Sequence, residues 1–430
     1  MKFKDTPIGE IISAWDIMHI DDLKSKKRNA IAMGPFGSNI KKENFQESGV
    51  PIIRGNNLKK FQFYDDDFVF VSEEKSEKLK SSWVFRKDIV ITHRGTLGQV
   101  CIIPENSNYE KYIISQSGMK LTVNEEIMNS RFLYYFLNSR VGQHQLLMNK
   151  SQVGVPAIAQ ASKSLKKIWV PVPSIQEQNR ISDMLSKLDS KIELNKKIIA
   201  TLEEIASTLF KRWFIDFEFP DERGNPYRSS GGKMIDSELG KIPEKWLVQA
   251  IGSCMENYDR KRVPLSKLER QKRKGSYPYY GAASLLDYVD DYIFDGTYLL
   301  LGEDGTVLTE KGKPVLQYIS GKFWVNNHAH VLMGKEDIST EWLMLFFKQV
   351  SVKSIVTGAV QPKISQRNLN SLPVILGTDN VHKLFNLIVK PLFNKMIILE
   401  RENITLSELR DTLLPKLLSG ELELPTTEEV

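Results

Sequence analysis

A short phrase of this sequence occurs twice, and the similarity around it extends along much of the chain. The string Pro-x-Ile-x-Gln begins at Pro156 and again at Pro362. Upstream of it, 85–96 (FRKDIVITHRGT) resembles 294–306 (FDGTYLLLGEDGT), and each apolar run bounded by a Gly-Thr turn predicts a β-hairpin. Internal similarity on this scale indicates duplicated structural units. The chain is therefore predicted to contain two copies of one mixed α/β globule, each followed by a long helix.

The segment after each globule has the pattern of a long helix. Ser174 and Glu177 form a capping box that marks a helix start. From Ile181 to Leu209 apolar residues recur at steps of four and three, the spacing of a coiled-coil seam. The stripe returns from Phe385 to Leu413, where Pro391 is expected to kink the helix near its start. Helices of about 40 residues reach roughly 60 Å, and neither stripe is expected to stay exposed.

Each stripe contains one Asn, Asn195 in the first helix and Asn403 in the second. One such stripe alone favours a helix that packs on its own domain, but two stripes in the same register favour packing against each other. A pseudo-two-fold relation between the copies places the helices antiparallel, and an Asn195–Asn403 pair then fixes their register. The predicted fold class is α+β: two mixed α/β domains separated by two long antiparallel helices that form a coiled coil, with a pseudo-two-fold internal repeat.

Composition is that of an ordinary globular protein with more than one domain. The 430 residues are 41% hydrophobic and 26% charged, enough to bury large cores. No apolar run of about 18 residues is present and the opening MKFKDTPIGE lacks a signal-peptide core, so a cytoplasmic location is expected. Cys101 and Cys254 are too few for a disulfide framework and are expected to be reduced packing residues. The net charge of +6 mildly favours an anionic partner.

Motifs for catalysis and metal binding are missing from the sequence. A G-x-x-x-x-G-K-[ST] phosphate loop is absent, and no G-x-G-x-x-G string lies between a predicted strand and a helix. His328 and His330 have no third ligand at metal-binding spacing, so no metal site is predicted. The carboxylates of Glu303 and Asp304 have no counterpart in the equivalent turn 93–96, which argues against a catalytic role. No catalytic residue is therefore predicted.

Basic and aromatic residues gather in one segment of each copy. In 257–282 a run of Lys and Arg precedes three tyrosines, and 24–45 is a sparser counterpart in the first copy. DNA phosphates favour such a segment through counterion release, and the polar and aromatic groups beside it can reach base edges or sugars. A solvated loop is the alternative interpretation. Recurrence of the segment at the same place in both copies favours DNA binding.

Five motifs carry a resemblance to a known family: GPFGSNIKK, WVPVPSIQEQNRISDMLSKLDSKIELNKK, LGKIPEKW, YPYYGA and LRDTLLPKLLSGEL. In this order the chain resembles, over essentially its whole length, the specificity subunit of type I restriction-modification systems. In that family two target recognition domains each read one short half of a split DNA sequence, and the helices hold them apart and dock methyltransferase subunits. The second helix departs from the pattern because it opens with LGTDNVHKLF. Thr378 or Asp379 is therefore expected to cap it, and docking of the second methyltransferase is expected to be less symmetric.

The repeat and the resemblance together divide the chain into six parts. These are target recognition domain 1 (1–172), the first long spacer helix (173–216), a linker rich in Gly, Pro and Ser (217–246), target recognition domain 2 (247–377), the second long spacer helix (378–418) and a C-terminal tail (419–430). The implied partners are double-stranded DNA, two methyltransferase (modification) subunits and restriction/translocase subunits, with no membrane. The chain itself is expected to be a non-catalytic DNA-recognition subunit that binds no cofactor. S-adenosylmethionine, ATP and magnesium are expected on the partner subunits.

The predicted DNA contacts are side chains in or next to predicted turns, from which they can project into a groove. In the first copy they are Gly37, Ser38, Asn39, Lys41, Lys42, His93, Arg94, Thr96, Gln99, Ser115 and Gln116. In the second copy they are Arg260, Lys261, Arg262, Arg273, Lys274, Tyr277, Tyr279, Tyr280, Glu303, Asp304, Asn326, Asn327, His328 and Lys363. The lysines and the basic run from Arg260 to Lys274 are expected to hold phosphates, and the other polar side chains to read base edges.

Two other functions fit parts of the sequence. One is a single-chain DNA methyltransferase or nuclease with degenerate motifs. The other is a scaffold whose coiled coil carries the function and whose globules bind protein. Methyl transfer by the chain alone distinguishes the first, and a steep dependence of DNA binding on salt distinguishes the second.

Overall fold

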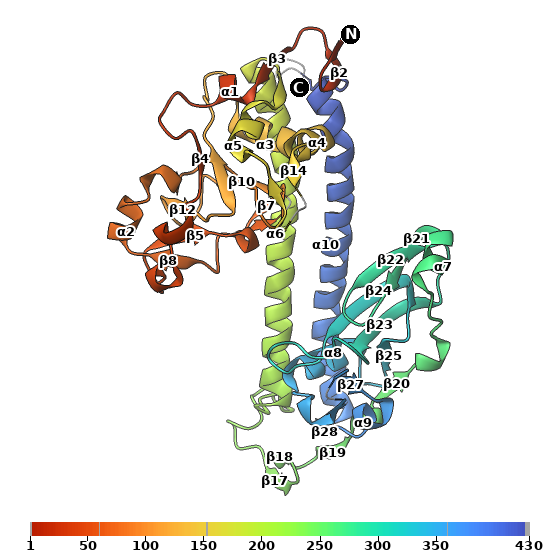
Figure 1. The fold of residues 1–430 in the computed structure, drawn as a ribbon. Helices are drawn as coiled ribbons and strands as arrows, with labels where there is room; N and C mark the ends of the chain where they lie inside the picture. The colour runs from red at the N-terminus through yellow and green to blue at the C-terminus, as the bar shows by residue number, and fades with distance from the viewer. Residues whose placement is uncertain (1, 60, 152–153, 359, 426–430) are drawn as a thin grey trace. The chain divides into compact units, whose positions relative to one another are not determined.

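The computed structural model describes residues 2–59, 61–151, 154–358 and 360–425 (Figure 1). The chain divides into two compact units: unit 1 comprises Met1–Glu193 and Glu402–Val430, and unit 2 comprises Leu194–Arg401. Two long helices, α6 (Ile175–Phe214) and α10 (Asp379–Ser419), cross the boundaries between the units. Each unit therefore holds one globule and one part of each long helix.

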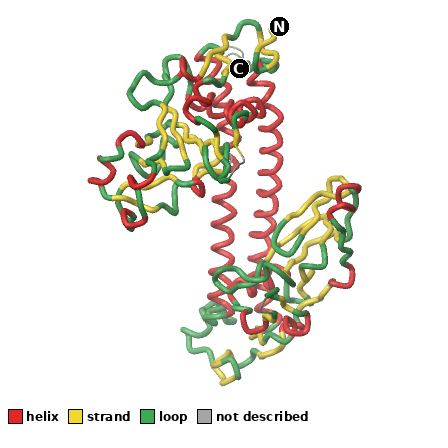
Figure 2. Tube along the Cα trace, viewed as in Figure 1, coloured by secondary structure: helices red, strands yellow, loops and turns green. Residues whose placement is uncertain are grey.

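Unit 1 contains two four-stranded sheets, ordered β11-β10-β13-β4 and β8-β5-β12-β9 (strands yellow in Figure 2). Their strands are β4 (Ile31–Met33), β5 (Val50–Ile53), β8 (Val69–Val71), β9 (Trp83–Val84), β10 (Ile89–Thr92), β11 (Val100–Ile102), β12 (Tyr112–Ile114) and β13 (Gly118–Leu121). Smaller antiparallel pairs are β1 (Phe3–Thr6) with β2 (Gly9–Ile12), β6 (Leu58–Lys59) with β7 (Gln62–Phe63), β14 (Lys150–Ser151) with β15 (Ala157–Ile158), and β16 (Trp169–Val172) with β3 (Asp16–His19). The short helices are α1 (Ile20–Leu23), α2 (Glu73–Glu77), α3 (Ser130–Asn138), α4 (Arg140–Leu147) and α5 (Ala161–Lys166).

Unit 2 contains one six-stranded sheet with the order β20-β25-β23-β24-β21-β22. Its strands are β20 (Met255–Asn257), β21 (Lys274–Tyr280), β22 (Leu285–Val289), β23 (Phe294–Gly302), β24 (Leu316–Val325) and β25 (Ala329–Gly334). Smaller pairs are β17 (Met234–Ser237) with β18 (Gly240–Pro243), β19 (Leu247–Ala250) with β28 (Pro373–Leu376), and β26 (Val356–Thr357) with β27 (Lys363–Ile364). The short helices are α7 (Lys267–Lys272), α8 (Thr340–Gln349) and α9 (Gln366–Asn370).

The two globules repeat one order of elements from the first hairpin strand onward, which confirms the predicted duplication, although unit 1 has two four-stranded sheets and unit 2 has one six-stranded sheet. Each segment predicted to be a hairpin supplies the first strand of one: β10 in 85–96 pairs with the later strand β11, and β23 in 294–306 pairs with the later strand β24. In each unit the first hairpin strand also pairs with a following antiparallel strand, β13 or β25, and a short helix comes next, α3 or α8. A small hairpin and a closing strand then complete each globule.

The apolar run of β10 is explained by burial on both faces of its strand. Ile89 and Ile91 pack into the core that contains α3, and Val90 packs into a separate core on the opposite face. Strand β23 repeats this arrangement, because Leu299 and Leu301 belong to the core that contains α8 and Leu300 belongs to another. Alternating residues of a strand point to opposite faces, so a strand covered on both sides reads as a continuous apolar run.

The repeated Pro-x-Ile-x-Gln phrase fastens a turn to the small hairpin in unit 1. The N–H of Gly95 donates to the carbonyl of Pro156 at 2.9 Å, and the N–H of Ile158 donates to the carbonyl of His93 at 2.9 Å. The Ile158 side chain is 3% exposed and lies in the core with α3. We refer to residues 156–158 as the clasp of unit 1.

Unit 2 forms the same clasp with residues 362–364. The N–H of Gly305 donates to the carbonyl of Pro362 at 3.0 Å, and the N–H of Ile364 donates to the carbonyl of Glu303 at 2.8 Å. Ile364 is 0% exposed in the core with α8. The phrase occurs twice because each copy uses it to fix the turn that follows its first hairpin strand.

The long helices are continuous over 40 residues in α6 and 41 residues in α10, and α10 passes through Pro391. At the start of α6 the N–H of Glu177 donates to Ser174 Oγ at 3.2 Å, as the predicted capping box requires. The Glu177 carboxylate, however, accepts from the indole N–H of Trp15 at 3.1 Å. This cap residue therefore joins the helix start to the first globule.

The helix segments pack antiparallel within each unit, as predicted. In unit 1 Ile181 and Leu185 lie in one core with Leu417 and Leu414 from the other end of α10. In unit 2 the ring of Phe214 stacks on His382, and Phe210 lies edge-on to Phe385. In both units, residues later in α6 therefore pack against residues earlier in α10.

The predicted pairing of Asn195 with Asn403 stays a prediction. Asn195 belongs to unit 2 and is 0% exposed, whereas Asn403 belongs to unit 1 and is half-buried. The seam position of Asn195 is thus confirmed by its burial.

The segment 217–246, which we predicted to be a linker, is anchored to unit 2. Phe217, Phe219 and Trp246 are buried in the core with α8, and the Phe219 ring stacks on Trp246 with centroids 4.9 Å apart. The segment also forms the β17–β18 hairpin. It connects α6 to the second globule, and its aromatic residues bury enough apolar surface to hold it against that globule.

Cys101 and Cys254 are both free and buried, as expected for packing residues. Burial raises the pKa of the Cys101 thiol to about 12, although the carbonyls of Lys59 and Gln62 accept from it. Among the helices that the structure describes, none is long and apolar enough to cross a membrane.

Candidate nucleic-acid interface

Unit 1 presents the turn 93–96 as a group of exposed side chains on a fixed backbone. Arg94 and Thr96 are exposed, and Gly95 has a φ of +81°, a conformation that favours glycine. The N–H groups of His93 and Arg94 both donate to the carbonyl of Ser117, at 2.9 and 3.3 Å. The turn is thus held on one side by Ser117 and on the other by the clasp.

Two more predicted segments lie beside this turn. The ring of Phe36 lies 6.5 Å from that of His93, centroid to centroid, which brings the loop 34–39 to the turn. A Cβ at Gly34 would lie 1.9 Å from the Ser115 carbonyl oxygen, so only glycine allows this loop to pass the 115–117 segment. The structure therefore places three segments that we predicted to contact DNA, 34–39, 93–96 and 115–117, next to one another in unit 1.

The exposed members of this gathered surface in unit 1 are Gly37, Asn39, Arg94, Thr96 and Gln116; Lys41 and Lys42, which follow the loop, are also exposed. Ser115 is half-buried, with its Oγ 3.1 Å from that of Ser117. The side chain of Ser38 lies outside what the structure describes.

His93 and Gln99 face the interior rather than the surface. His93 is 4% exposed, and burial lowers its pKa, which favours the neutral ring. Gln99 donates through Nε2 to the carbonyl of Leu58 at 2.6 Å, and its N–H donates to Thr92 Oγ1 at 3.0 Å. Both residues therefore support the turn from inside, whereas we predicted them as DNA contacts that project from it.

In unit 2 the equivalent turn 303–306 carries different side chains. Asp304 is hydrogen-bonded to the ring of His328, which is exposed, as is its neighbour Asn327. Asn326 is 7% exposed and accepts the N–H of His328 at 2.9 Å, so it shapes the loop. Asp304, Asn327 and His328 thus form one polar surface at the place that Arg94, Thr96 and Gln116 occupy in unit 1.

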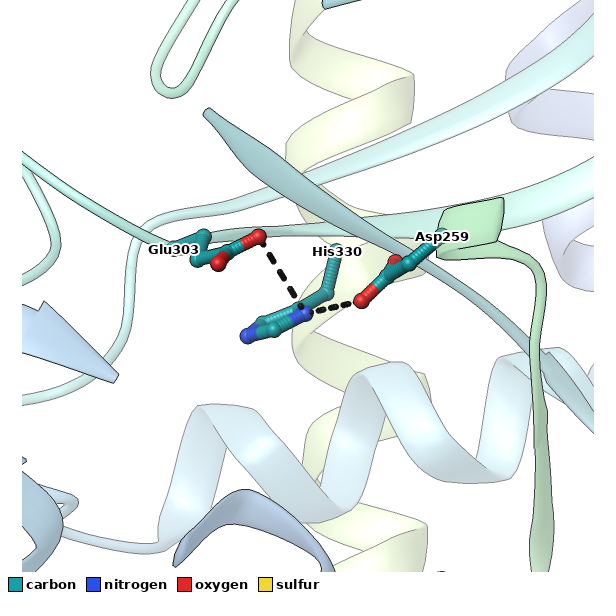
Figure 3. Close-up of side chains that lie close together, drawn as sticks. All are labelled: Asp259, Glu303 and His330. Atoms are coloured by element: carbon teal, nitrogen blue, oxygen red, sulfur yellow. Dashed lines mark hydrogen bonds and ion pairs between the residues drawn. The ribbon is translucent and has the colours of Figure 1, made fainter. Parts of the chain in front are cut away.

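Behind this surface lies a buried charge network centred on His330 (Figure 3). His330 is 1% exposed; its Nδ1 lies 2.6 Å from Asp259 and 3.7 Å from Glu303. Its Nε2 lies 2.8 Å from the carbonyl oxygen of Ile364, where it donates. The network therefore reaches the clasp of unit 2.

Arg262 and Lys363 complete the network. Arg262 Nη1 donates to Glu303 at 2.7 Å, and the Lys363 ammonium lies 3.2 Å from the other oxygen of that carboxylate. Burial alone raises the pKa of Asp259 and of Glu303, but hydrogen bonds from His330 and Arg262 and the nearby positive charges hold both pKa values below their ordinary range. Both carboxylates are therefore ionised and paired.

Asp259, Glu303 and His330 also satisfy the distance condition for a metal site, since their ligand atoms lie within 4.8 Å of one another. The sequence-based reason for predicting no metal was thus wrong, because folding brings distant carboxylates to His330. The donor set does not fit an ion well, however. Arg262 already neutralises Glu303, and both nitrogens of His330 face acceptors, so neither lone pair points to a common centre.

The basic segment of unit 2 is divided between internal and exposed side chains. Arg273 pairs with Asp290 at 2.9 Å and lies over the ring of Trp324, and Lys274 pairs with Asp287 at 2.5 Å. The exposed members are Arg260, Lys261, Lys267, Lys272 and Lys274, of which Lys267 and Lys272 lie at the ends of α7.

The three predicted tyrosines pack within unit 2. Tyr279 is 1% exposed and accepts the N–H of Leu265 at 2.9 Å. Tyr280 lies edge-on to Phe323, and Tyr277 contacts Tyr292. The three tyrosines in this part of the sequence therefore mainly reflect packing of a strand in an aromatic core.

Two copies of one globule, each with an exposed polar turn on a shared framework, define a duplicated recognition protein. Residues 14–204 and 243–408 match the family model described as the type I restriction modification DNA specificity domain. The chain belongs to this family and contains its domain twice, so it is a specificity subunit of a type I restriction-modification system.

Specificity subunits of other organisms are similar to this chain over most or nearly all of its length. The type I restriction enzyme MjaIX specificity subunit of Methanocaldococcus jannaschii is 25% identical over 444 residues, covering 98% of this chain and 96% of the relative. The HindI specificity subunit of Haemophilus influenzae is 23% identical over 384 residues, which cover 74% of this chain and 83% of the relative. The crystal structure of a type I system S subunit from M. genitalium has the same fold, with a TM-score of 0.57 at 17% identity and coverage of 96% and 97%.

Proposed function

We propose that each globule reads one half of a split DNA sequence through the side chains around its clasped turn. The observation that carries this proposal is the contrast between framework and surface. Both turns are fixed by the same backbone bonds to the clasp, but Arg94 in unit 1 stands where Asp304 stands in unit 2. Guanidinium and carboxylate groups select different base edges, so one framework with exchangeable side chains suits two different half-sites.

The long helices are proposed to set the spacing between the half-sites and to dock methyltransferase subunits. Their continuity over 40 and 41 residues supports a rigid spacer. In unit 2, near the start of α10, the exposed fractions of Leu384, Leu387 and Ile388 are 46%, 73% and 44%. Exposed apolar groups at such spacing on one helix face are typical of a protein contact. At the equivalent positions α6 has Arg180, Asp183 and Met184, which supports unequal docking at the two helices.

Catalysis is proposed to belong to the partner subunits, together with S-adenosylmethionine, ATP and magnesium. The absence of nucleotide-binding motifs from the sequence supports this division. Incubation of the purified chain alone with DNA and S-adenosylmethionine tests it. Methyl transfer without a partner would favour the single-chain methyltransferase instead.

Exchange of residues 1–170 for the same region of a relative with another target is expected to change one half of the recognised sequence and to leave the other half unchanged. The reason is that each globule has its own core and its own turn. The target is read from methylation patterns of the assembled complex on a library with both halves randomised. A simultaneous change in both halves would contradict modular reading.

Replacement of the exposed basic residues of unit 2 by Ala is expected to weaken binding to all DNA sequences alike. Arg260, Lys261, Lys267 and Lys272 are suitable positions, and each phosphate that is no longer neutralised lowers the salt slope of log K by about one. The matched control is Lys335, which is exposed in the same unit at the other end of β25. A flat salt dependence in the parent protein would favour the protein-binding scaffold.

A further inference from the structure

Two side chains that we predicted to touch DNA, Arg262 and Glu303, have internal partners in unit 2. Besides Glu303, the Arg262 guanidinium contacts the carbonyl oxygens of Ala329 at 2.6 Å and Asn327 at 3.4 Å, and the carboxylate of Asp259 at 3.5 Å. Its side chain is 11% exposed and that of Glu303 is 13% exposed. One guanidinium therefore ties the turn 303–306 to the segment 327–329 that lies beside it.

Asp259 and His330 extend this tie to the rest of the framework. Asp259 accepts from His330 through one carboxylate oxygen, and through the other from the N–H of Val331 at 2.9 Å. His330 in turn donates to the carbonyl of Ile364 in the clasp at 2.8 Å. The turn, its neighbouring loop and the clasp are thus held by one set of buried, mutually compensating charges.

We infer that Asp259, Arg262 and His330 are positioning residues for recognition of the second half-site. They hold Asp304, Asn327 and His328 in one arrangement before DNA binds, so that less conformational entropy is lost on binding and wrong bases meet a surface that does not adapt. This inference rests on the proposed function of the turn 303–306. It assigns a specificity role to Asp259 and His330, neither of which lies on the polar surface itself.

Unit 1 holds its turn by other means, which makes the inference specific to one half-site. Backbone pairing places Thr92 opposite Gly118 and Gly302 opposite Ala329, so Met119 is the counterpart of His330. His93 takes the place of Glu303 and is buried next to Phe36. Disruption of the charge network should therefore leave reading of the first half-site untouched.

The test compares Arg262→Lys and Asp259→Asn with the parent in the assembled complex, on a DNA library with both half-sites randomised. Lys keeps the charge of Arg262 but cannot reach several acceptors at once, and Asn removes the charge of Asp259. We expect discrimination at the second half-site to fall about tenfold, the size of one base preference, with the first half-site unchanged. The melting temperature of the complex is measured in parallel.

Tyr318→Phe is the matched control, because the Tyr318 hydroxyl also makes an internal hydrogen bond to a carboxylate of unit 2, that of Glu341, at 2.6 Å. It is expected to leave discrimination unchanged. An equal loss of discrimination in Tyr318→Phe would overturn the inference, since the effect would then be a general loosening of unit 2. The inference also fails when both network variants unfold unit 2, because the role of the network is then structural.

Asp304→Ala and Asn327→Ala separate this inference from the proposed function. If these two substitutions lower discrimination at the second half-site while Arg262→Lys and Asp259→Asn do not, the inference about positioning residues is wrong, but the proposal that the turn 303–306 reads bases is supported. If Asp304→Ala and Asn327→Ala change nothing, the turn is not the reading element, and the proposed function fails at this point together with the inference.

Discussion

Replacing Arg410 by Ala is expected to destabilise unit 1 by about 3–4 kcal/mol, because the substitution leaves a buried carboxylate without its cation. Arg410 Nη1 donates to Asp189 at 2.8 Å, and the hydroxyl of Tyr135 donates to the other oxygen of that carboxylate at 2.7 Å. The guanidinium also lies 3.7 Å from the ring centroid of Phe61. These interactions join α10, α6 and the first globule within unit 1.

The acid–base behaviour of Asp189 supports this magnitude. Burial raises the pKa of Asp189 even though Arg410 and Tyr135 act to lower it. The pair is therefore held together at a considerable desolvation cost, and loss of the cation removes the compensation. At pH 7 the carboxyl can escape by taking up a proton, which costs about 4 kcal/mol for a group with an ordinary pKa. Protonation thus sets an upper limit close to the expected value.

Hydrogen exchange followed on peptides of α3 and β10 along a urea series measures this effect in unit 1 alone, since a chain with two units is not expected to unfold in one step. Lys191→Ala is the control: its ion pair with Glu402 is 3.5 Å long and exposed, and its removal should cost less than about 1 kcal/mol. An Arg410→Ala effect no larger than that of the control would show that the pair does not hold unit 1 together.

Local patterns predicted the fold of this chain well. The two hairpins, the capped helix and the antiparallel seams all leave short-range signals, namely apolar runs, turn residues and heptad spacing. Duplication added a second, independent copy of each signal. The packing of the linker 217–246 on unit 2 was not predicted, because the burial of Phe217 and Trp246 depends on a core elsewhere in the chain.

The internal charge networks could not be predicted from these local patterns, because their partners are far apart in the sequence. Asp259 and His330 are 71 residues apart in the chain, and nothing in the sequence near either residue indicates the other. A weak signal did exist in the repeat, because His330 aligns with the buried Met119 of unit 1. A polar residue at a position that is apolar in its twin indicates a buried group with a partner. The same comparison would have flagged Arg410, whose counterpart in the first helix is Ala206.

Acidification from pH 7 to about pH 4 is expected to destabilise unit 2 by about 3 kcal/mol through His382 alone. His382 is 2% exposed between the rings of Phe214 and Trp342, with centroids 5.0 and 5.3 Å away. Neither of its ring nitrogens has a hydrogen-bond partner among the described residues. Burial lowers the pKa of His382 to about 4, and the nearby Asp337 offsets this only in part.

The direction of this effect follows from proton binding. An unfolded His has a pKa of about 6.5, so between that pH and about 4 the unfolded chain binds a proton that the folded chain excludes. The contribution of the neutral ring to the free energy of unfolding is therefore complete above about pH 6.5 and decreases as the pH falls to about 4. A pKa difference of about 2.5 units, at about 1.4 kcal/mol each, amounts to about 3.5 kcal/mol in full, of which about 3 kcal/mol is reached at pH 4, where the folded ring is half protonated. Leu has a volume similar to that of His and cannot titrate, so His382→Leu should remove this pH-dependent component of stability. Urea unfolding curves recorded by tryptophan fluorescence at the two pH values measure it. The control His144→Gln, at an exposed site of unit 1, should leave the component unchanged. Equal acid sensitivity of His382→Leu and the parent would mean that other groups carry the pH dependence of unit 2.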